Sequence, residues 1–327
     1  MLDKMEQTNF SGVAYLAAKE PWAMARGFAD RANERPNAID TRFGIGSGSK
    51  AFTAVVVCQL VEEGKISFED QLSHLLPKTF PHFNVTIHQL LTHTSGIPDY
   101  FDEQVMDDYE DLWKQRPMYR MQTASDFIPL FKELPMMFKP GERFHYNNAG
   151  YIALGLIIEN VTGKEFTDVV TARIFEPAEM RNSGYFSLDR LPGQTAFGYI
   201  EEEGMWRTNQ YAIPVRGGAD RGAYVTASDM ANFWNCLMNG TLLTKDMLPK
   251  MLQASATRNN SDYGYGIWIQ TQANGALKYH IMGHEPGVSF HSAFYAAEHN
   301  VLTVLSNKSE GAHELAMTLE ELKIGKE

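Results

Sequence analysis

The sequence predicts an α/β fold in which strands lie at both ends of the chain and a helical block lies between them. Residues 11–30 and the stretches from residue 263 onward are short, bounded by turns and rich in aromatic or β-branched residues, as antiparallel strands are. Between them, apolar residues recur at helical spacing. We therefore expect an α/β domain built from residues 1–45 and 184–327, and a mostly helical domain over residues 46–183.

Length and composition agree with this division and limit the choice of partners. At 327 residues the chain exceeds the usual size of one hydrophobic core. Its composition, 44% hydrophobic and 21% charged, is ordinary for a globular protein. The net charge is −11 and the lysines and arginines form no cluster, which argues against nucleic acids and anionic membrane surfaces as partners.

Targeting signals and disulfides are not evident. The N-terminal stretch MLDKMEQTNF lacks the apolar centre of a secretory leader, and no apolar run is long enough to span a bilayer. We therefore expect a cytoplasmic protein, or a secreted one whose leader has been trimmed. Cys58 and Cys236 both fall in apolar helical patterns and are predicted to be buried free thiols.

The N-terminal half predicts two strands and then a series of helices. Residues 11–30 form the strands around Lys19–Pro21, and residues 42–45 lead into the first helix. Apolar residues cover every face from Ala51 to Val61, which is typical of a helix inside a core, and Gly64 is suited to end it. Further helices are expected after the capping-box pair Ser67 and Asp70, and over Thr86–Thr94, Thr123–Leu134, Ala149–Val161 and Thr167–Phe175.

Residues 99–122 are acidic and aromatic, and the pattern changes again after residue 184. We interpret residues 99–122 as a solvated helix–loop segment, with a mobile flap over a site as the alternative. Gly184–Tyr199 and Trp206–Tyr211 are strand-like, and Thr226 caps a helix that continues to Met238. Four sequential strands are then expected over Tyr263–Gln270, Ala276–Ile281, Val288–Ala296 and Asn300–Ser306, with a closing helix over Ala312–Leu322.

The start of the apolar helix carries a candidate nucleophile. Ser47 precedes the helix and Lys50 follows three positions later, so both side chains share one helical face. Burial favours the neutral lysine, which is a general base, and a helix N-terminus supplies free N–H groups. A serine in this setting can attack a carbonyl carbon. The alternative is an N-cap serine beside a surface lysine, since this spacing arises by chance about once in a chain of this length.

The loop from His145 to Asn148 offers the second part of a site. Tyr146 could deliver a proton to a leaving group if a nearby lysine ammonium lowered its pKa. Asn148 could bind a substrate amide or hold Lys50 in place. The alternative is a packed tyrosine at the start of a helix, with Asn148 as the N-cap.

These motifs resemble those of the serine β-lactamase and penicillin-binding-protein superfamily, in its class C and D-alanyl-D-alanine carboxypeptidase/esterase branch. That branch combines Ser-x-x-Lys at a helix N-terminus, Tyr-x-Asn on a loop and Lys-Thr-Gly or His-x-Gly on a strand. Ser47–Lys50 and Tyr146–Asn148 are the single matches to the first two motifs. The stretches LLTHTSGIPDY, GGADRGAYVTASDM and YGYGIW also match in order, so the resemblance covers nearly the whole chain.

The resemblance implies a fold, a mechanism and the residues that carry it. It implies a five-stranded antiparallel sheet flanked by helices, beside an all-helical lobe. It also implies that Ser47 is the nucleophile, Lys50 its base partner and Tyr146 the acid–base group for the leaving group. No metal and no organic cofactor are implied.

The third motif departs from the pattern, because no Lys-Thr-Gly, Lys-Ser-Gly or His-x-Gly occurs. Two alignments are possible. Counting back from the Pro286–Gly287 pair aligns Ile281–Gly283 with the three residues of the motif. Matching by residue type instead aligns His280 with the first residue of the motif, one position earlier in the chain. A one-residue slip turns a strand side chain to the other face, so the two alignments disagree on whether His280 reaches the site. Gly283 would let a substrate backbone approach. Backbone N–H groups of Ser47 and of a residue near His284 would hold the oxyanion.

The sequence also offers two other interpretations. His280, His284 and Glu285 could suggest a metal site, but Pro286 follows at once and no third ligand is evident, so we expect no metal there. A non-catalytic binding or sensor module with the same fold is the second. The presence of Ser47 together with its two partner residues argues against it.

The expected substrate is therefore a small-molecule or peptide ester or amide, cleaved through an acyl-enzyme on Ser47. In the branch that the chain resembles, the cation of the third motif helps to hold a substrate carboxylate. If Ile281 occupies that position, the pocket wall is apolar there. We therefore expect esterase or D-peptidase activity rather than efficient turnover of β-lactams. The oligomeric state is not determined by these patterns.

Overall fold

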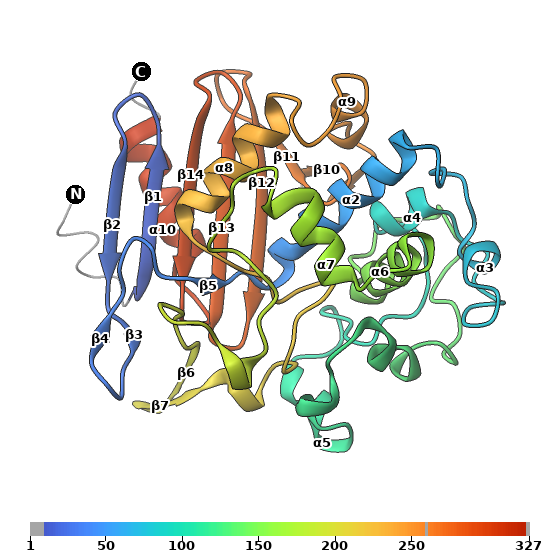
Figure 1. The fold of residues 1–327 in the computed structure, drawn as a ribbon, viewed down its shortest axis with the longest axis horizontal. Coiled ribbons are helices and arrows are strands. Elements are labelled where there is room, and N and C mark those ends of the chain that lie inside the picture. Colours follow the sequence, from blue (N-terminus) through green and yellow to red (C-terminus); the bar gives the residue numbers. More distant parts are fainter. Residues whose placement is uncertain (1–9, 259–260, 325–327) are drawn as a thin grey trace.

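The computed structural model describes residues 10–258 and 261–324, and one antiparallel sheet forms its centre (Figure 1). Its strands, in chain order, are β1 (Gly12–Ala17), β2 (Trp22–Arg26), β9 (Ala256–Arg258), β10 (Ser261–Tyr263), β11 (Trp268–Thr271), β12 (Leu277–Glu285), β13 (Val288–Tyr295) and β14 (Asn300–Ser306). Within the sheet they lie in the order β2–β1–β14–β13–β12–β11–β10–β9. Strand β1 pairs with β14 from Gly12–Ser306 to Ala17–Val301, so the two ends of the chain share one sheet.

The α/β fold class with a large antiparallel sheet is confirmed, but the sheet has eight described strands rather than five. One cause lies in the stretch from Tyr263 to Gln270, which was expected to be a single strand. Gly266 has a φ of +71°, a left-handed conformation that suits glycine, and the chain turns there. The stretch therefore divides between β10 and β11, which pair with each other.

In the described part of the chain, three short two-stranded ribbons accompany the central sheet. They are β3 (Phe28–Asp30) with β4 (Arg35–Pro36), β5 (Phe43–Gly44) with β8 (Tyr224–Val225), and β6 (Tyr199–Glu202) with β7 (Met205–Thr208). The β5–β8 pair matters for the site, because it places the segment before Ser47 beside the GGADRGAY block.

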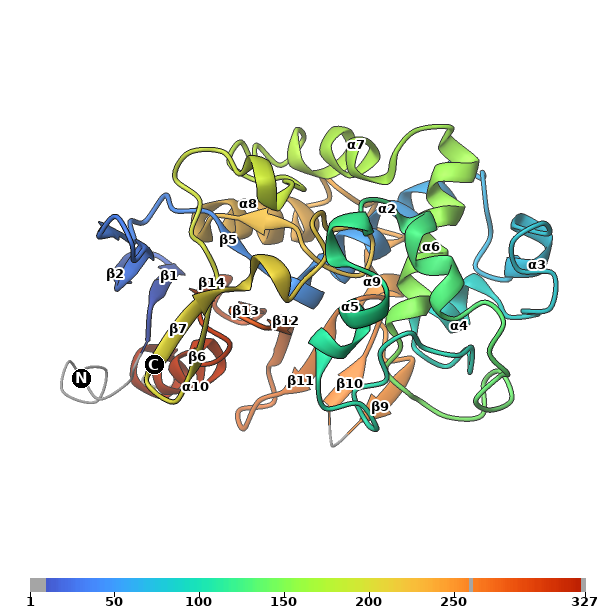
Figure 2. The same ribbon diagram turned by 90° about the horizontal axis from the view of Figure 1, so that it is seen from below.

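Helices cover both faces of the central sheet. Helix α8 (Ala227–Met238) packs on β14 and β1 from one side, and α10 (Ala312–Leu319) packs on β14 and β13 from the other (Figures 1 and 2). Side chains alternate along a strand, so each strand contributes to two cores. Val301 and Leu305 belong to the larger core, whereas Leu302 and Val304 pack under α10.

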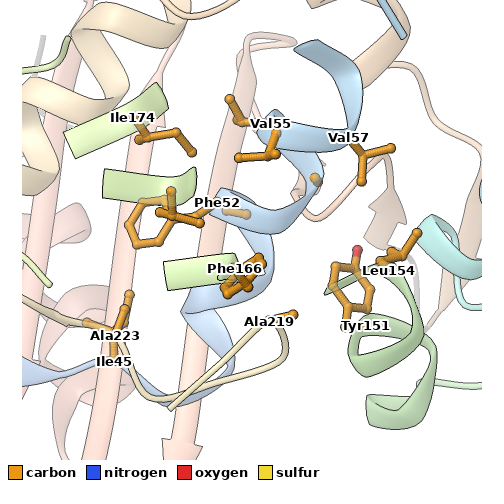
Figure 3. Packing of buried hydrophobic residues seen from close by; sticks show 14 of the residues in the cluster. Ile45, Phe52, Val55, Val57, Tyr151, Leu154, Phe166, Ile174, Ala219 and Ala223 are labelled. Carbon is orange, nitrogen blue, oxygen red and sulfur yellow. The ribbon is translucent and has the colours of Figure 1, made fainter. Parts of the chain in front are cut away.

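Helix α2 (Lys50–Glu62) is the central helix of the larger core. Its residues from Lys50 to Cys58 are all buried, as the apolar pattern predicted. Figure 3 shows Phe52, Val55 and Val57 surrounded by side chains from neighbouring helices. The other helices are η1 (Gly46–Ser49), α3 (Leu72–Leu75), α4 (Ile87–Leu91), η2 (Tyr109–Asp111), α5 (Leu112–Gln115), η3 (Met118–Arg120), η4 (Ala124–Leu130), α6 (Asn148–Thr162), α7 (Phe166–Val170), η5 (Thr171–Phe175), η6 (Leu188–Arg190), η7 (Asn209–Tyr211), α9 (Leu248–Met251) and η8 (Glu320–Ile324).

Some local expectations need correction. The segment predicted as a helix over Thr123–Leu134 is the 3₁₀ helix η4, with Pro129 inside it. The N-cap of α6 is Asn147 rather than Asn148, since the Asn147 side chain accepts a hydrogen bond from the Gly150 amide. Cys58 is buried as expected, but Cys236 is only half-buried.

The structure does not test the expected domain division or the expected absence of a leader. The division into two domains stays a prediction. Residues 1–9, where no leader was recognised, lie outside the described residues. Within the described part of the chain, no helix is both long and apolar enough to cross a membrane.

Candidate active site

Ser47 lies in a tight turn that is held by hydrogen bonds within the turn and to the neighbouring segment at Ala223. It belongs to η1, which leads directly into α2. The amide of Ile45 donates to the carbonyl of Ala223 (3.0 Å), and the Ser49 hydroxyl donates to the carbonyl of Gly46 (2.9 Å). Gly46 has a φ of +48°. The turn is therefore fixed by backbone geometry, and neither η1 nor α2 has a side-chain N-cap hydrogen bond.

Lys50 is buried and its amine contacts three oxygens. Its Nζ lies 3.0 Å from Ser47 Oγ, 2.9 Å from Asn148 Oδ1 and 2.9 Å from the carbonyl oxygen of Asp220. Burial lowers the pKa of Lys50 to about 8, although the nearby Asp220 works in the opposite direction. The surface-lysine alternative is therefore wrong.

The three contacts decide which way a neutral amine must face. A neutral amine has two N–H donors and one lone pair, whereas the ammonium has three donors. Asn148 Oδ1 and the Asp220 carbonyl have no hydrogen to give. Only the Ser47 hydroxyl can donate to the lone pair. Loss of a proton from Lys50 thus turns the Ser47 hydrogen toward Nζ, which is the geometry that a serine nucleophile and its base need.

Tyr146 lies beside both residues. Lys50 Nζ is 4.9 Å from the centre of its ring, and its phenol interacts with the Ser47 side chain. Burial nevertheless raises the pKa of Tyr146 well above 10, and Glu103 adds to the increase. The expectation that a lysine ammonium lowers this pKa is wrong, because loss of solvation dominates. Tyr146 is therefore a neutral phenol that can donate a hydrogen bond or a proton.

Asn148 is buried at the first turn of α6 and holds Lys50 in position. Its Oδ1 accepts from Lys50, and its Nδ2 donates to the carbonyl oxygen of Phe101 (3.0 Å). Asp99 accepts hydrogen bonds from the backbone amides of Asn148 (2.8 Å) and Ala149 (2.9 Å). Both ends of the Asn148 amide are thus engaged within the protein, which favours the Lys50-holding alternative over a direct contact with substrate.

Strand β12, which carries the candidates for the third motif, contacts the serine turn at Gly283. A Cβ atom at Gly283 would lie only 1.8 Å from the carbonyl oxygen of Ile45, so only glycine fits there. Ile281 is buried in the core on the same strand face as Gly283. The count that put Ile281–Gly283 on the motif therefore agrees with the structure. His284 lines the cleft beside Ser47. Its backbone amide nitrogen lies close to the serine turn, because a Cβ atom added at Gly46 would be only 3.3 Å from it.

His280 does not reach this site. It pairs with Ala293 and lies on the α10 face of β12, one residue out of phase with Gly283. Its ring stacks between Trp268 and His291, with centroid distances of 6.5 and 5.4 Å. Burial lowers the pKa of His280 to about 3, so the ring is neutral at physiological pH.

Arg221, which was not among the predicted site residues, is buried beside the site. Its Nε donates to Asp220 Oδ2 (3.0 Å) and its Nη1 donates to Glu285 Oε1 (3.0 Å). The guanidinium also stacks over Tyr109, 4.3 Å from the ring centre. This network fixes the Asp220 carbonyl that Lys50 contacts. The only signal in the sequence was an Asp-Arg pair inside the small-residue block GGADRGAY.

A cleft of about 730 Å³ lies above these residues. Ser47, Tyr146, Gly283 and His284 all line it. The acidic segment 99–122 forms part of its wall through residues between Phe101 and Glu110. That segment was interpreted as a solvated helix–loop, with a mobile flap over a site as the alternative. The structure shows that part of it lines the cleft, and its mobility stays a prediction. The catalytic candidates thus meet at the floor of one cleft, where a carbonyl compound can reach Ser47.

Comparisons with known proteins agree with this arrangement. The family described as Beta-lactamase matches residues 2–324. The crystal structure of a penicillin binding protein from Bacillus halodurans is 51% identical, has a TM-score of 0.94, and the match covers 98% of this chain and 99% of that one. Penicillin-binding protein 4* of Bacillus subtilis (strain 168) is 30% identical over 302 residues, which is 87% of this chain.

The extent of these matches differs. The chain spans only 64% of the length of the Bacillus subtilis relative. A D-stereospecific amidohydrolase from Streptomyces sp. has a TM-score of 0.83 over 98% of this chain and 96% of its own, at 23% identity. That last likeness is one of fold alone.

Proposed function

Because the chain belongs to the Beta-lactamase family of serine hydrolases, we propose that it forms an acyl-enzyme on Ser47 and cleaves an ester or amide. The resemblance that the motifs predicted is thus confirmed at the level of the family. One observation carries the proposal for this chain. The buried amine of Lys50 lies 3.0 Å from Ser47 Oγ at the floor of an open cleft.

Acylation follows from the positions of these groups. Neutral Lys50 takes the proton of the Ser47 hydroxyl while Ser47 Oγ bonds to the substrate carbonyl carbon. The carbonyl π electrons move to oxygen, and the amides of Ser47 and His284 donate hydrogen bonds to the oxyanion. When the carbonyl re-forms, the bond to the leaving group breaks. Tyr146 gives its proton to the leaving group and regains one from the Lys50 ammonium.

Deacylation returns the enzyme to its starting state. Water loses a proton to neutral Lys50 as it attacks the acyl carbon. The bond between that carbon and Ser47 Oγ then breaks, and Oγ recovers the proton. The raised pKa of Tyr146 supports its role as a neutral proton donor rather than as a phenolate base.

The same geometry supports neutral esters and amides over β-lactams. If the motif count is right, Ile281 stands where the branch that the chain resembles carries a lysine or histidine, and Ile281 is buried and apolar. A substrate carboxylate would lose a charged hydrogen bond there, worth about 1.5–3 kcal/mol. Because 1.4 kcal/mol corresponds to about tenfold in binding, penicillins and cephalosporins should be turned over weakly.

The first experiment tests the nucleophile. We expect a fluorophosphonate probe to label the wild-type protein on Ser47, as read by intact mass and peptide mapping. Ser47→Ala should lose both the label and ester hydrolysis while it keeps the wild-type melting temperature. Ser309→Ala is the matched control, because Ser309 lines the same cleft and should remain outside the reaction. Wild-type turnover by Ser47→Ala would refute the proposal.

A substrate panel tests the activity within the family. kcat/KM should be measured for short-chain p-nitrophenyl esters, a D-alanyl peptide and a chromogenic cephalosporin under the same conditions. We expect at least one ester or amide to exceed the cephalosporin by tenfold or more. Cephalosporin hydrolysis faster than every other substrate would contradict the assignment of Ile281.

A further inference from the structure

The amine of Lys50 contacts two oxygens besides Ser47 Oγ, and both must stay in place for catalysis. They are Asn148 Oδ1 and the carbonyl oxygen of Asp220, each at 2.9 Å. Because neither oxygen carries a hydrogen, the Ser47 hydroxyl is the one donor to the neutral amine. Arg221 holds Asp220 through its hydrogen bond to Asp220 Oδ2 (3.0 Å). The remaining question is what holds Asn148.

The orientation of the Asn148 side chain is set by two acceptors on one side of its amide. Its Nδ2 donates to the carbonyl oxygen of Phe101 (3.0 Å) and to Asp99 Oδ2 (3.2 Å). Only the nitrogen of an amide side chain carries hydrogens, so the nitrogen must lie on this side. The amide therefore presents Oδ1, and not its NH2 group, to Lys50.

The carboxylate of Asp99 also holds the main chain of the same residue. Its Oδ2 accepts from the amide of Asn148 (2.8 Å), and its Oδ1 accepts from the amide of Ala149 (2.9 Å). These amides belong to the first turn of α6, where N–H groups have no partner within the helix and an anion is favoured. The Asn147 side chain accepts from the next amide, that of Gly150 (2.7 Å). Asp99 thus fixes both the backbone and the side chain of Asn148.

Asp99 acts from behind the site rather than from the cleft. It is half-buried and is not one of the described residues that line the cleft. Its carboxylate also influences Lys50 through charge. Burial and Arg221 lower the pKa of Lys50, and the carboxylates of Asp220, Glu103 and Asp99 raise it. A test of Asp99 must therefore separate the position of Asn148 from the loss of one charge.

We propose that Asp99 is a positioning residue, which holds Asn148 so that neutral Lys50 accepts the proton of Ser47 and of no other group. The proposal rests on the acyl-enzyme function proposed above. Without the hydrogen bonds to Asp99, the Asn148 side chain is free to rotate, and its Nδ2 can then donate to the lone pair of Lys50. That donor competes with the Ser47 hydroxyl, so the amine is neutral but occupied.

Asp99→Asn tests this role, because it keeps the size of the side chain but replaces an acceptor oxygen by an NH2 group. We expect kcat/KM for phenyl acetate at pH 9.5 to fall by about tenfold to a hundredfold, the scale on which misplacement of a catalytic group acts. Asp99→Ser is the second variant, since a serine hydroxyl is a common partner of helix N-termini and favours folding. It should show a loss of the same size.

The pH profile separates positioning from a loss of folded protein. Burial raises the pKa of Asp99 to about 7, so Asp99 is mostly ionised above pH 7.5. From pH 7.5 to 9.5 the wild-type kcat/KM should rise about fourfold, because the pKa of Lys50 is about 8. In Asp99→Asn the rise should be less than about twofold, since loss of a carboxylate and of the Asn148 contact both lower the pKa of Lys50. A variant that is only less folded keeps the wild-type rise.

A double variant tests whether Asp99 acts through Asn148. Asn148→Ala should itself lower kcat/KM at pH 9.5. Asp99→Asn combined with Asn148→Ala should match the slower single variant to within about twofold, because residues that act through one another are not additive. Thr86→Ala is the control for a lost helix cap, since Thr86 Oγ1 accepts from the Gln89 amide (3.2 Å) at the start of α4. It should lower the melting temperature and keep the wild-type kcat/KM.

The outcomes separate this proposal from the proposed function. Additive losses in the double variant would overturn the role of Asp99. So would an unchanged rate at pH 9.5 in Asp99→Asn, because the carboxylate would then act through its charge alone. A lower rate with the wild-type rise between pH 7.5 and 9.5 would mean a purely structural role. Each of these results leaves the acyl-enzyme function intact if the wild-type protein is labelled and active at Ser47. A wild-type protein that is neither labelled nor active at Ser47 would overturn both proposals.

Discussion

Lys50 combines two properties that seldom occur together, complete burial and contact with three oxygens. Removal from water favours its neutral form, while nearby carboxylates, above all Asp220, favour the ammonium, and the pKa settles at about 8. The charged side chains that influence this value are Asp220, Arg221, Glu103 and Asp99. The result is an amine that is partly neutral at physiological pH and already in contact with the serine.

This pKa predicts the pH dependence of the reaction. The base form is the neutral amine, so kcat/KM should rise as pH increases through about 8 and then level off. The measurement is kcat/KM for phenyl acetate, whose charge does not change, from pH 6 to 10. Lys50→Arg should be inactive over this range, because a guanidinium is not deprotonated in proteins. A wild-type rate that falls between pH 7 and 9 would contradict the role of Lys50.

At the scale of elements, the site depends on the contact between strand β12 and the serine turn η1. Gly283 lies directly against the Ile45 carbonyl, and the strand continues to His284 and Glu285. The sequence pattern placed the end of this strand near Ile281, four residues too early. The extra residues are what bring the backbone of His284 beside Ser47.

The contact predicts that Gly283→Ala is severely damaging. Its Cβ would overlap the Ile45 carbonyl oxygen at 1.8 Å, so the strand and the serine turn must separate. Overpacking of this kind costs about 1–3 kcal/mol, and we expect a lower melting temperature together with loss of most ester hydrolysis. Gly193→Ala is the control, since no atom lies within 4 Å of its added Cβ. Wild-type activity in Gly283→Ala would show that the contact is dispensable.

At the scale of the whole molecule, the sheet separates two chemically different sides. The α2 side carries the serine site, and the α10 side buries His280 and His291 in contact with each other. The ring nitrogens of both histidines are buried and have no hydrogen-bond partner among the described residues. Each histidine is therefore held in its neutral form in the folded protein.

The buried histidines predict a loss of stability in acid. Burial lowers the pKa of His280 from 6.5 to about 3, so below pH 6.5 the unfolded chain binds a proton that the folded protein does not. The lowered pKa has no effect on the free energy of unfolding above pH 6.5. As the pH falls from 6.5 toward 3, the free energy of unfolding decreases, and one such residue lowers it by up to about 2 kcal/mol at pH 5. The free energy of unfolding should be measured at pH 7.5 and 5.

Two variants identify the source of that loss. His280→Phe keeps a ring between Trp268 and His291 and should make the difference between the two pH values smaller. His74→Gln changes an exposed histidine and should leave the difference as it is in the wild type. An identical loss in all three proteins would exclude His280 as the cause.

The sequence by itself determined the parts that depend on short-range pattern. Four features could be recognised in the sequence, because helical and strand periodicity act over a few residues. They are the apolar faces of α2, the Ser47–Lys50 spacing, the Tyr146 loop and the sequential C-terminal strands. The same patterns predicted the fold class and, through the motifs, the family.

The tertiary structure alone decided what lies between segments far apart in the chain. It turned His280 to the far face of β12, because a strand alternates its side chains and the register is set by pairing with β13. It raised the pKa of Tyr146, because burial is a property of the assembled fold. It also brought Arg221 and Glu103 to the cleft, although neither was among the predicted site residues. Contacts between distant segments determine both the protonation state and the position of a side chain. No local pattern in the sequence encodes these contacts.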